Sequence, residues 1–258
     1  MKLIKIWLLY TNFSFQQVLT NRVLMGIFLA GKLIRIALFL VFLSFIFKGI
    51  TDIAGYSRQQ IIFFYLAFNF IDTSAQLFFR EVYRFRSLVV SGNLDFVLLK
   101  PVNPLVKVLL GGADIMDLII LLLILAAVVV VGSKITADPL AWLGFLLLTG
   151  NAVLISAAFH ILVLGLGTIT LSIDHLIMIY RDLTALMRIP VDLYIEPLRS
   201  LLTFVLPLGI MFTFPPKALM GLLSWPLVLL SFVAALSTLY LALAFWRYSL
   251  RHYQSASS

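Results

Sequence analysis

The sequence predicts an all-α polytopic membrane protein, and three observations lead to this class. Apolar residues make up 62% of the 258 residues, charged residues make up 12%, and the mean hydropathy is +1.10. The apolar residues gather in runs that approach or exceed the roughly 20 residues a helix needs to cross a bilayer. Lys and Arg collect between these runs. Such a chain has no water-facing shell, so we predict one transmembrane domain covering residues 1–258.

Composition also excludes several functions. The net charge of +8 would suggest nucleic acid in a soluble chain, but here the basic residues flank apolar runs, where they orient the protein and meet lipid head groups. We therefore expect membrane lipid as a partner and no nucleic acid. The absence of cysteine excludes thiol catalysis, and His160, His175 and His252 are scattered. We expect no catalytic, metal or cofactor site in the chain.

Residues 1–20 read as an interfacial helix that precedes the spans. One helical face is polar and carries Lys2, Lys5, Asn12 and Gln16. The other is apolar and carries Leu3, Ile6, Trp7, Tyr10 and Phe13. This is the pattern of a helix lying at the membrane surface.

Six spans follow, at about residues 23–47, 60–79, 105–131, 140–170, 198–214 and 227–246. The third begins with Gly111-Gly112-Ala113, small residues that favour close helix packing. Phe214-Pro-Pro-Lys217 is expected to break the fifth span. The apolar segment 218–225 after it is too short to cross, which predicts a partly inserted helix on the outer side before span six.

Charged and polar residues inside the first two spans mark a candidate translocation path. Lys32 and Arg35 share a face of span one, and each costs roughly 2.5–3.5 kcal/mol at a helix centre unless it faces protein, water or an interface. Snorkelling towards the cytoplasm and a substrate role both remain open. Asn69, Asp72 and Gln76 form a polar stripe on span two, which either contacts cargo or pairs with Arg35. The candidate path is Arg35, Asn69, Asp72 and Gln76.

The segment Gly26–Leu33 looks like a phosphate-binding loop, G-x-x-x-x-G-K-[ST], but departs from it. Leu33 stands where a magnesium-binding hydroxyl is required, and the intervening residues are apolar. ATP-driven activity would therefore need a second polypeptide that binds ATP and magnesium.

The polar segment 80–104 is the main interruption between apolar runs. Val82, Phe85 and Val89 lie on one stripe of a predicted amphipathic surface helix over residues 82–90, with Arg84 and Ser87 off it. Gly92 supplies a turn, and Pro101 and Pro104 prevent a continuing helix. This segment is either a surface offered to a soluble partner or an ordinary charged loop.

The distribution of Lys and Arg predicts the orientation. Thirteen lie in predicted inner segments, which include residues 80–107 and a second inner loop at 174–199, and four lie in outer segments. By the positive-inside rule both termini are cytoplasmic.

The order of several motifs resembles one permease family. Residues 92–101 fit G-x-L-D-x-x-L-x-[KR]-P, and Arg188-Ile-Pro190, Leu201–Pro207 and Phe214-Pro-Pro216 follow at similar spacing. The chain resembles the six-span membrane subunits of ABC type-2 exporters. The resemblance implies a permease that dimerises with a copy or a sister subunit, binds a separate ABC ATPase and resides in a bacterial plasma (inner) membrane. The implied coupling residues are Arg84, Arg86, Gly92, Asp95, Lys100 and Pro101; Asp95 is equally suited to capping the local turn.

Two other functions compete with an exporter permease. An ion-coupled secondary transporter would show inverted repeats, and we find no convincing internal repeat. An intramembrane enzyme would need converging acid groups; Asp114 and Asp117 share a helix face but lie near the membrane boundary, and His160 has no evident partner.

Overall fold

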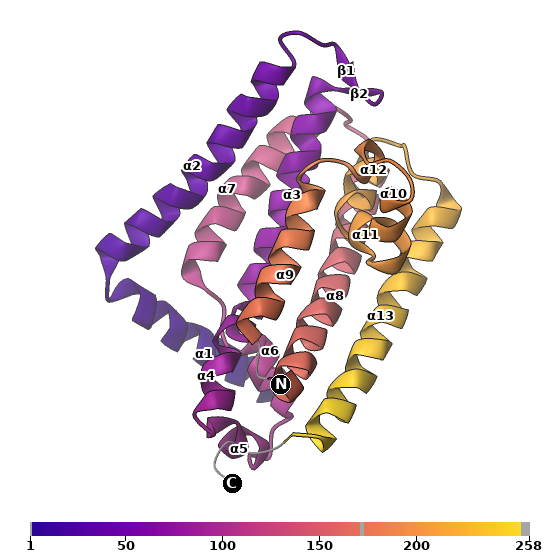
Figure 1. Cartoon of the computed structure of the whole chain (residues 1–258). Coiled ribbons are helices and arrows are strands. Elements are labelled where there is room, and N and C mark those ends of the chain that lie inside the picture. The colour runs from indigo at the N-terminus through magenta and orange to yellow at the C-terminus, as the bar shows by residue number, and fades with distance from the viewer. Residues whose placement is uncertain (1, 171–172, 254–258) are drawn as a thin grey trace.

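The computed structural model describes residues 2–170 and 173–253 and confirms an all-α polytopic protein (Figure 1). In these residues five helical runs are long and apolar enough to cross a bilayer: α2 (Arg22–Ile46), the run Arg58–Val90, α7 (Ile115–Gly132), α8 (Pro139–Thr170) and α13 (Trp225–Arg251). The run Arg58–Val90 comprises α3 (Arg58–Phe79), a 3-10 helix η1 (Arg80–Arg84) and α4 (Phe85–Val90).

Helices α3 and α8 form the centre of the bundle, and α2 and α13 lie on its two flanks (Figure 1). In their most apolar windows, 78% of the Arg58–Val90 run is buried against 11% of α2. The α8–α13 contact includes a buried hydrogen bond, in which Asn151 Nδ2 donates to the Ser231 carbonyl at 2.9 Å. Helix α2 buries only Ile36 and Leu43, so polar contacts matter more for its position.

The bundle has two distinct ends. The first, which we call the α5 end, holds α1 (Lys2–Leu19), α4, α5 (Asn93–Leu98) and α6 (Pro104–Leu110) (Figure 1). The other, the hairpin end, holds β1 (Asp52–Ile53) and β2 (Tyr56–Ser57), an antiparallel pair in which Asp52 faces Ser57. Helices α1 and α2 meet at the α5 end, and α13 finishes there.

Local sequence explains where several helices begin. Ser57 and Gln60 form a reciprocal capping box at the start of α3. Asn103 caps α6, whose first residue is Pro104, a position where the missing N–H of proline costs nothing. Asp114 caps α7 by accepting the Met116 N–H at 2.8 Å.

The predicted third span is divided into α6 and α7 at Gly111–Ala113. A Cβ on Gly111 would lie 2.4 Å from Glu81 Cγ, and one on Gly112 would lie 2.9 Å from the Tyr10 carbonyl oxygen. These glycines therefore admit η1 and α1 at close range, which agrees with the close packing expected there.

The expected fifth span at 198–214 and inner loop at 174–199 are wrong. Asp174 pairs with Arg86 at the α5 end, whereas Asp192 accepts a hydrogen bond from Tyr56 at the hairpin end. The chain between them, α9 (Ile173–Ala185) and the 3-10 helix η2 (Leu186–Arg188), therefore runs from one end of the bundle to the other, and we infer that it makes the fifth crossing. Hydropathy misses α9 because charged residues interrupt it: Ile173 and Ile177 are buried, while Asp174, Arg181 and Asp182 are exposed.

Residues 191–219 instead fold as short pieces at the hairpin end: η3 (Val191–Leu193), α10 (Leu198–Ser200), the π-helical η4 (Leu201–Val205), α11 (Leu208–Phe212) and α12 (Phe214–Leu219). The partly inserted helix expected at residues 218–225 is therefore not found there; the short buried helices are α11 and α12. Pro215 and Pro216 do not interrupt a helix here, because they occupy the first turn of α12, where a missing N–H is tolerated. Lys217 on α12 pairs with Asp192 at 2.8 Å and anchors the segment.

The fifth crossing predicts a labelling pattern in this cysteine-free chain. Ile195 and Leu99 are each 81% exposed, at the hairpin end and the α5 end respectively. We expect Ile195→Cys to share its reactivity towards an impermeant thiol reagent in intact cells with Ser57→Cys, and Leu99→Cys to show the opposite reactivity. If Ile195→Cys behaves as Leu99→Cys does, residues 174–199 form one loop and the crossing by α9 is refuted.

Candidate functional site

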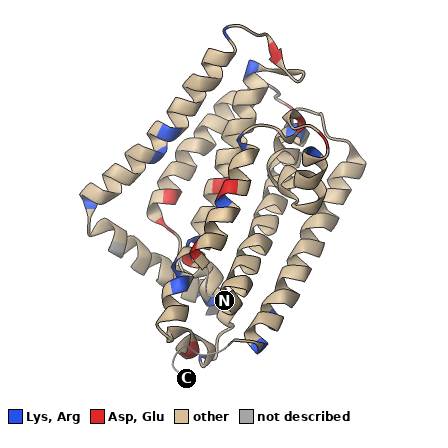
Figure 2. Cartoon of the chain, in the orientation of Figure 1, with Lys and Arg blue, Asp and Glu red and all other residues tan. Residues whose placement is uncertain are grey.

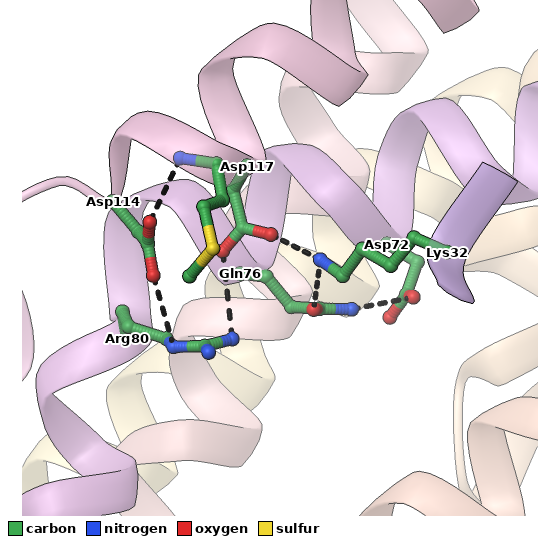
Figure 3. Close-up of polar contacts among 7 residues, drawn as sticks. Lys32, Asp72, Gln76, Arg80, Asp114 and Asp117 are labelled. Carbon is green, nitrogen blue, oxygen red and sulfur yellow. Dashed lines mark hydrogen bonds and ion pairs between the residues drawn. The ribbon is translucent and has the colours of Figure 1, made fainter. Parts of the chain in front are cut away.

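A buried ion-pair cluster ties three elements together near the α5 end (Figure 3). Asp114 and Asp117 at the start of α7 are 2% and 1% exposed. Arg80 of η1 reaches both, with Nε 3.5 Å from Asp114 Oδ2 and Nη1 3.6 Å from Asp117 Oδ2. Lys32 of α2 donates to Asp117 Oδ1. Two cations therefore compensate two carboxylates that would be costly to bury alone.

This cluster resolves two alternatives left open by the sequence. The Lys32 ammonium points into the bundle towards α7, and does not snorkel to the membrane surface (Figure 3). Asp114 and Asp117, the acid pair on one helix face that the sequence offered, are held in ion pairs, and Asp114 also caps α7. The geometry assigns them a structural role.

The polar contacts continue from this cluster into the bundle. Lys32 Nζ also donates to Gln76 Oε1 at 3.2 Å, and Gln76 Nε2 donates to Asp72 Oδ2 at 2.7 Å. Figure 3 shows the resulting chain of contacts, which runs from Arg80 through Asp117, Lys32 and Gln76 to Asp72.

Asp72 opens onto a cleft between α2, α3 and the α9–η2 segment. Its lining includes all four candidate path residues: Arg35, Asn69, Asp72 and Gln76. The predicted polar stripe therefore faces inward. Asp72 is hydrogen-bonded to Gln76, and no ion pair between described residues joins it to Arg35.

Elsewhere the long helices are largely uncharged, and charge within their length is confined mainly to α2, α9 and the start of α7 (Figure 2).

Three polar residues of the cleft were missed by sequence reasoning. Arg181, Thr184 and Arg188 line it from α9 and η2, although the sequence had placed them in a cytoplasmic loop. Their spacing of three and four residues puts them on one helical face, and that signal identifies them once α9 is recognised as a crossing.

At the α5 end, α4 and α5 form an elbow around Gly92, which has the positive φ of 71° that glycine tolerates. Val82, Phe85 and Val89 are buried at 0%, 0% and 1%, as their predicted stripe requires. Residues 82–90 are not a separate surface helix, however, because η1 and α4 continue α3 without a break. The 33-residue run would extend roughly 50 Å as an ideal helix, beyond a hydrocarbon core of roughly 30 Å, so it is long enough for α4 to extend past the core.

The inner side of the elbow rests on the crossing helices. Phe85 and Val89 belong to one apolar cluster with Ile173 and Ile177 of α9 and with Trp246 of α13. The Phe85 and Trp246 rings meet edge to face, 6.4 Å between centroids. Movement of the elbow would therefore displace α9, because a close-packed core transmits strain.

The outer side of the elbow is basic and apolar together. The Arg84 and Arg86 side chains are 47% and 58% exposed, with partners Glu81 at 3.6 Å and Asp174 at 3.1 Å. Phe96 and Leu99 are 65% and 81% exposed. The remaining implied coupling residues also lie here: Lys100 and Pro101 are exposed, and Asp95 occupies the first turn of α5.

A membrane-embedded helical bundle with a charged cleft between its crossings and a projecting elbow has the form of a transporter's membrane domain. Comparison with protein families matches residues 33–257 to the ABC-2 family transporter proteins, and the chain belongs to this family. Searches of curated proteins and of solved structures give no match. The protein is therefore a membrane protein of an ABC-2 type transporter family.

The ion-pair cluster predicts a large stability difference between two arginines. Arg80→Leu leaves two buried carboxylates with Lys32 as their one remaining cation, so we expect a loss of about 3 kcal/mol. Arg86→Leu breaks a pair whose members are 58% and 55% exposed, so the loss should stay below about 1 kcal/mol. Thermal unfolding of the purified variants in detergent measures both. Equal losses would show that the cluster adds no more than a surface pair does.

Proposed function

We propose that this chain is the membrane-spanning permease subunit of an ATP-driven ABC exporter. It forms the translocation path as a dimer, with a second copy or a sister permease, and it couples to a separate ATPase subunit. Family membership supports the class of transporter, and the projecting elbow supports coupling to a soluble partner.

The exposed side of the elbow is the observation that carries this proposal. Phe96 and Leu99 lie about one helical turn apart at the C-terminal end of α5, and both are exposed. Large apolar side chains with basic neighbours, here Arg84, Arg86 and Lys100, suit a partner groove that has an apolar floor and an acidic rim. The proposed occupant of this surface is the ATPase subunit.

The proposed coupling runs through α9. Its first turns pack against the elbow, its later turns line the cleft with Arg181, and η2 directly after it adds Arg188. A displacement of the elbow by the ATPase would therefore change the cleft directly. The path residues Arg35, Asn69, Asp72 and Gln76 are proposed to contact the exported molecule there.

ATP and magnesium are proposed to bind the partner only. Gly26–Leu33 lies inside α2, where backbone N–H groups are used in helical hydrogen bonds and are not free to surround a phosphate. The α5 end, with α1 and the end of α13, is proposed to face the cytoplasm of a bacterial inner membrane. Most of the basic residues outside the bundle lie at that end, as the positive-inside rule requires.

Charge reversal on the elbow tests the partner surface. Replacing Arg84 and Arg86 together by Glu removes two ion pairs whose arginines are exposed, and Glu81 keeps its second partner Lys107, so we expect unchanged membrane abundance. Co-purification of the ATPase from the native membrane should fall by tenfold or more, and export should stop. Membrane abundance and ATPase recovery are measured side by side. Full ATPase recovery with the double variant would reduce the elbow to a topogenic charge cluster.

Gly92→Val tests whether the shape of the elbow matters. Valine at φ 71° costs roughly 1–2 kcal/mol or more and should open the turn between α4 and α5, lowering ATPase recovery. The matched control is Gly221→Val, which meets the same strain at φ 68° at the hairpin end with no atom near the added Cβ. We expect the control to lose comparable thermal stability and to retain the ATPase. Equal loss of ATPase in both variants would attribute the effect to folding alone.

A further inference from the structure

The cleft between α2, α3 and α9 carries an excess of positive charge. Three guanidinium groups line it, from Arg35 on α2, Arg181 on α9 and Arg188 on η2. The cleft contains one carboxylate, Asp72, and that group already accepts a hydrogen bond from Gln76. The neighbouring Lys32 and Asp117 pair with each other and leave this balance unchanged.

The three arginines have no direct polar partner among the described residues, although Arg35 and Arg181 lie near enough to the Asp72 carboxylate to attract it through space. Among the described residues, no ion pair or hydrogen bond involves the side chain of Arg35, Arg181 or Arg188. Arg80 differs from them, because its guanidinium bridges the buried carboxylates of Asp114 and Asp117. Arg35 and Arg181 are exposed and Arg188 is half-buried, so all three are accessible at the mouth of the cleft.

Arginine is suited to oxyanions. Its planar guanidinium donates two parallel hydrogen bonds to a phosphate or carboxylate, and such bonds strengthen where water is partly excluded. Unpaired arginines within a membrane bundle are costly, and a bound oxyanion would remove that cost. The charge of the cleft therefore selects an anionic group.

Aromatic side chains line the same cleft beside the arginines. Phe39 lies one helical turn from Arg35, and its ring stacks on Tyr65 with 4.4 Å between centroids. Phe68 completes this apolar wall. The cleft thus places an apolar surface directly beside the positive one.

We infer that the cleft binds an amphiphile with an oxyanion head group, phosphate or carboxylate. The head lies among Arg35, Arg181 and Arg188, and the apolar part lies along Phe39 and Phe68. This inference rests on the proposed function, for which it specifies the class of exported molecule.

The test compares two lipids that differ by one phosphate. The full chain is placed in phosphatidylcholine nanodiscs and titrated with fluorescent phosphatidic acid and with diacylglycerol carrying the same label. We expect phosphatidic acid to bind at least tenfold more tightly. Arg35→Gln, Arg181→Gln and Arg188→Gln should each weaken its binding by roughly tenfold, the loss of a charge-assisted hydrogen bond. Where a Gln variant does not elute as a folded protein in size-exclusion chromatography, the Lys variant at the same position is titrated in its place.

Arg58→Gln is the control, because Arg58 starts α3 at the hairpin end and does not line the cleft. Its binding of phosphatidic acid should equal that of the unchanged protein. Glycerol 3-phosphate, a head group without acyl chains, should compete only at far higher concentration than the lipid. Competition at equal concentration would overturn the amphiphilic part of the inference.

Equal binding of the two lipids, or a loss with Arg58→Gln as large as with the cleft variants, would overturn the inference. Recovery of the ATPase with the same preparations distinguishes a failure of this inference from a failure of the proposed exporter function. An unchanged protein that retains the ATPase but does not distinguish the lipids refutes the anionic substrate alone. One that recovers no ATPase refutes the exporter function.

Discussion

The burial of Asp117 beside Lys32 and Arg80 constrains the rest of the bundle. Helix α2 has few buried apolar residues, and the Lys32–Asp117 contact joins it to α7 where apolar packing is sparse. Arg35 lies one turn further along α2, so the same contact sets where its guanidinium meets the cleft. A buried ion pair such as this one fixes where α2 lies more than it adds to the free energy of unfolding, since desolvation offsets much of its attraction. The cleft depends on this cluster for its shape.

Helix α9 relates the two candidate sites to one another. Its buried face packs on the elbow and on α8, and its polar face lines the cleft, so a single short crossing serves both surfaces. The chain of contacts from Arg80 to Asp72 is a second connection between the same regions (Figure 3). A permease driven by a separate ATPase needs such a link, because the energy enters at one end and the cargo binds within the membrane.

The hairpin end is held more firmly than its short helices suggest. Asp192 accepts the Tyr56 hydroxyl at 2.8 Å and pairs with Lys217, so one carboxylate joins β2, η3 and α12. Burial, reinforced by the hydrogen bond to Asp192, raises the pKa of the Tyr56 hydroxyl, which therefore remains a proton donor. Helix α11 is buried along its whole length and fills this end of the bundle, next to α8.

The sequence by itself determined the fold class, the N-terminal helix, five of the six predicted spans and the inward polar stripe of Asn69, Asp72 and Gln76, because hydropathy and helical periodicity are local properties. It also identified the Gly92 turn. Tertiary structure alone decided the fifth crossing and the arginines of the cleft. Helix α9 is too polar to be read as a span, and it is stable because α8 and α4 pack against its buried face while Arg181 faces an open cleft. Residues 198–214 are apolar enough to span, yet Pro207 and the pairing of Asp192 with Lys217 keep them at one end. Hydropathy measures the preference of a segment for lipid, whereas a crossing inside a bundle is surrounded by protein.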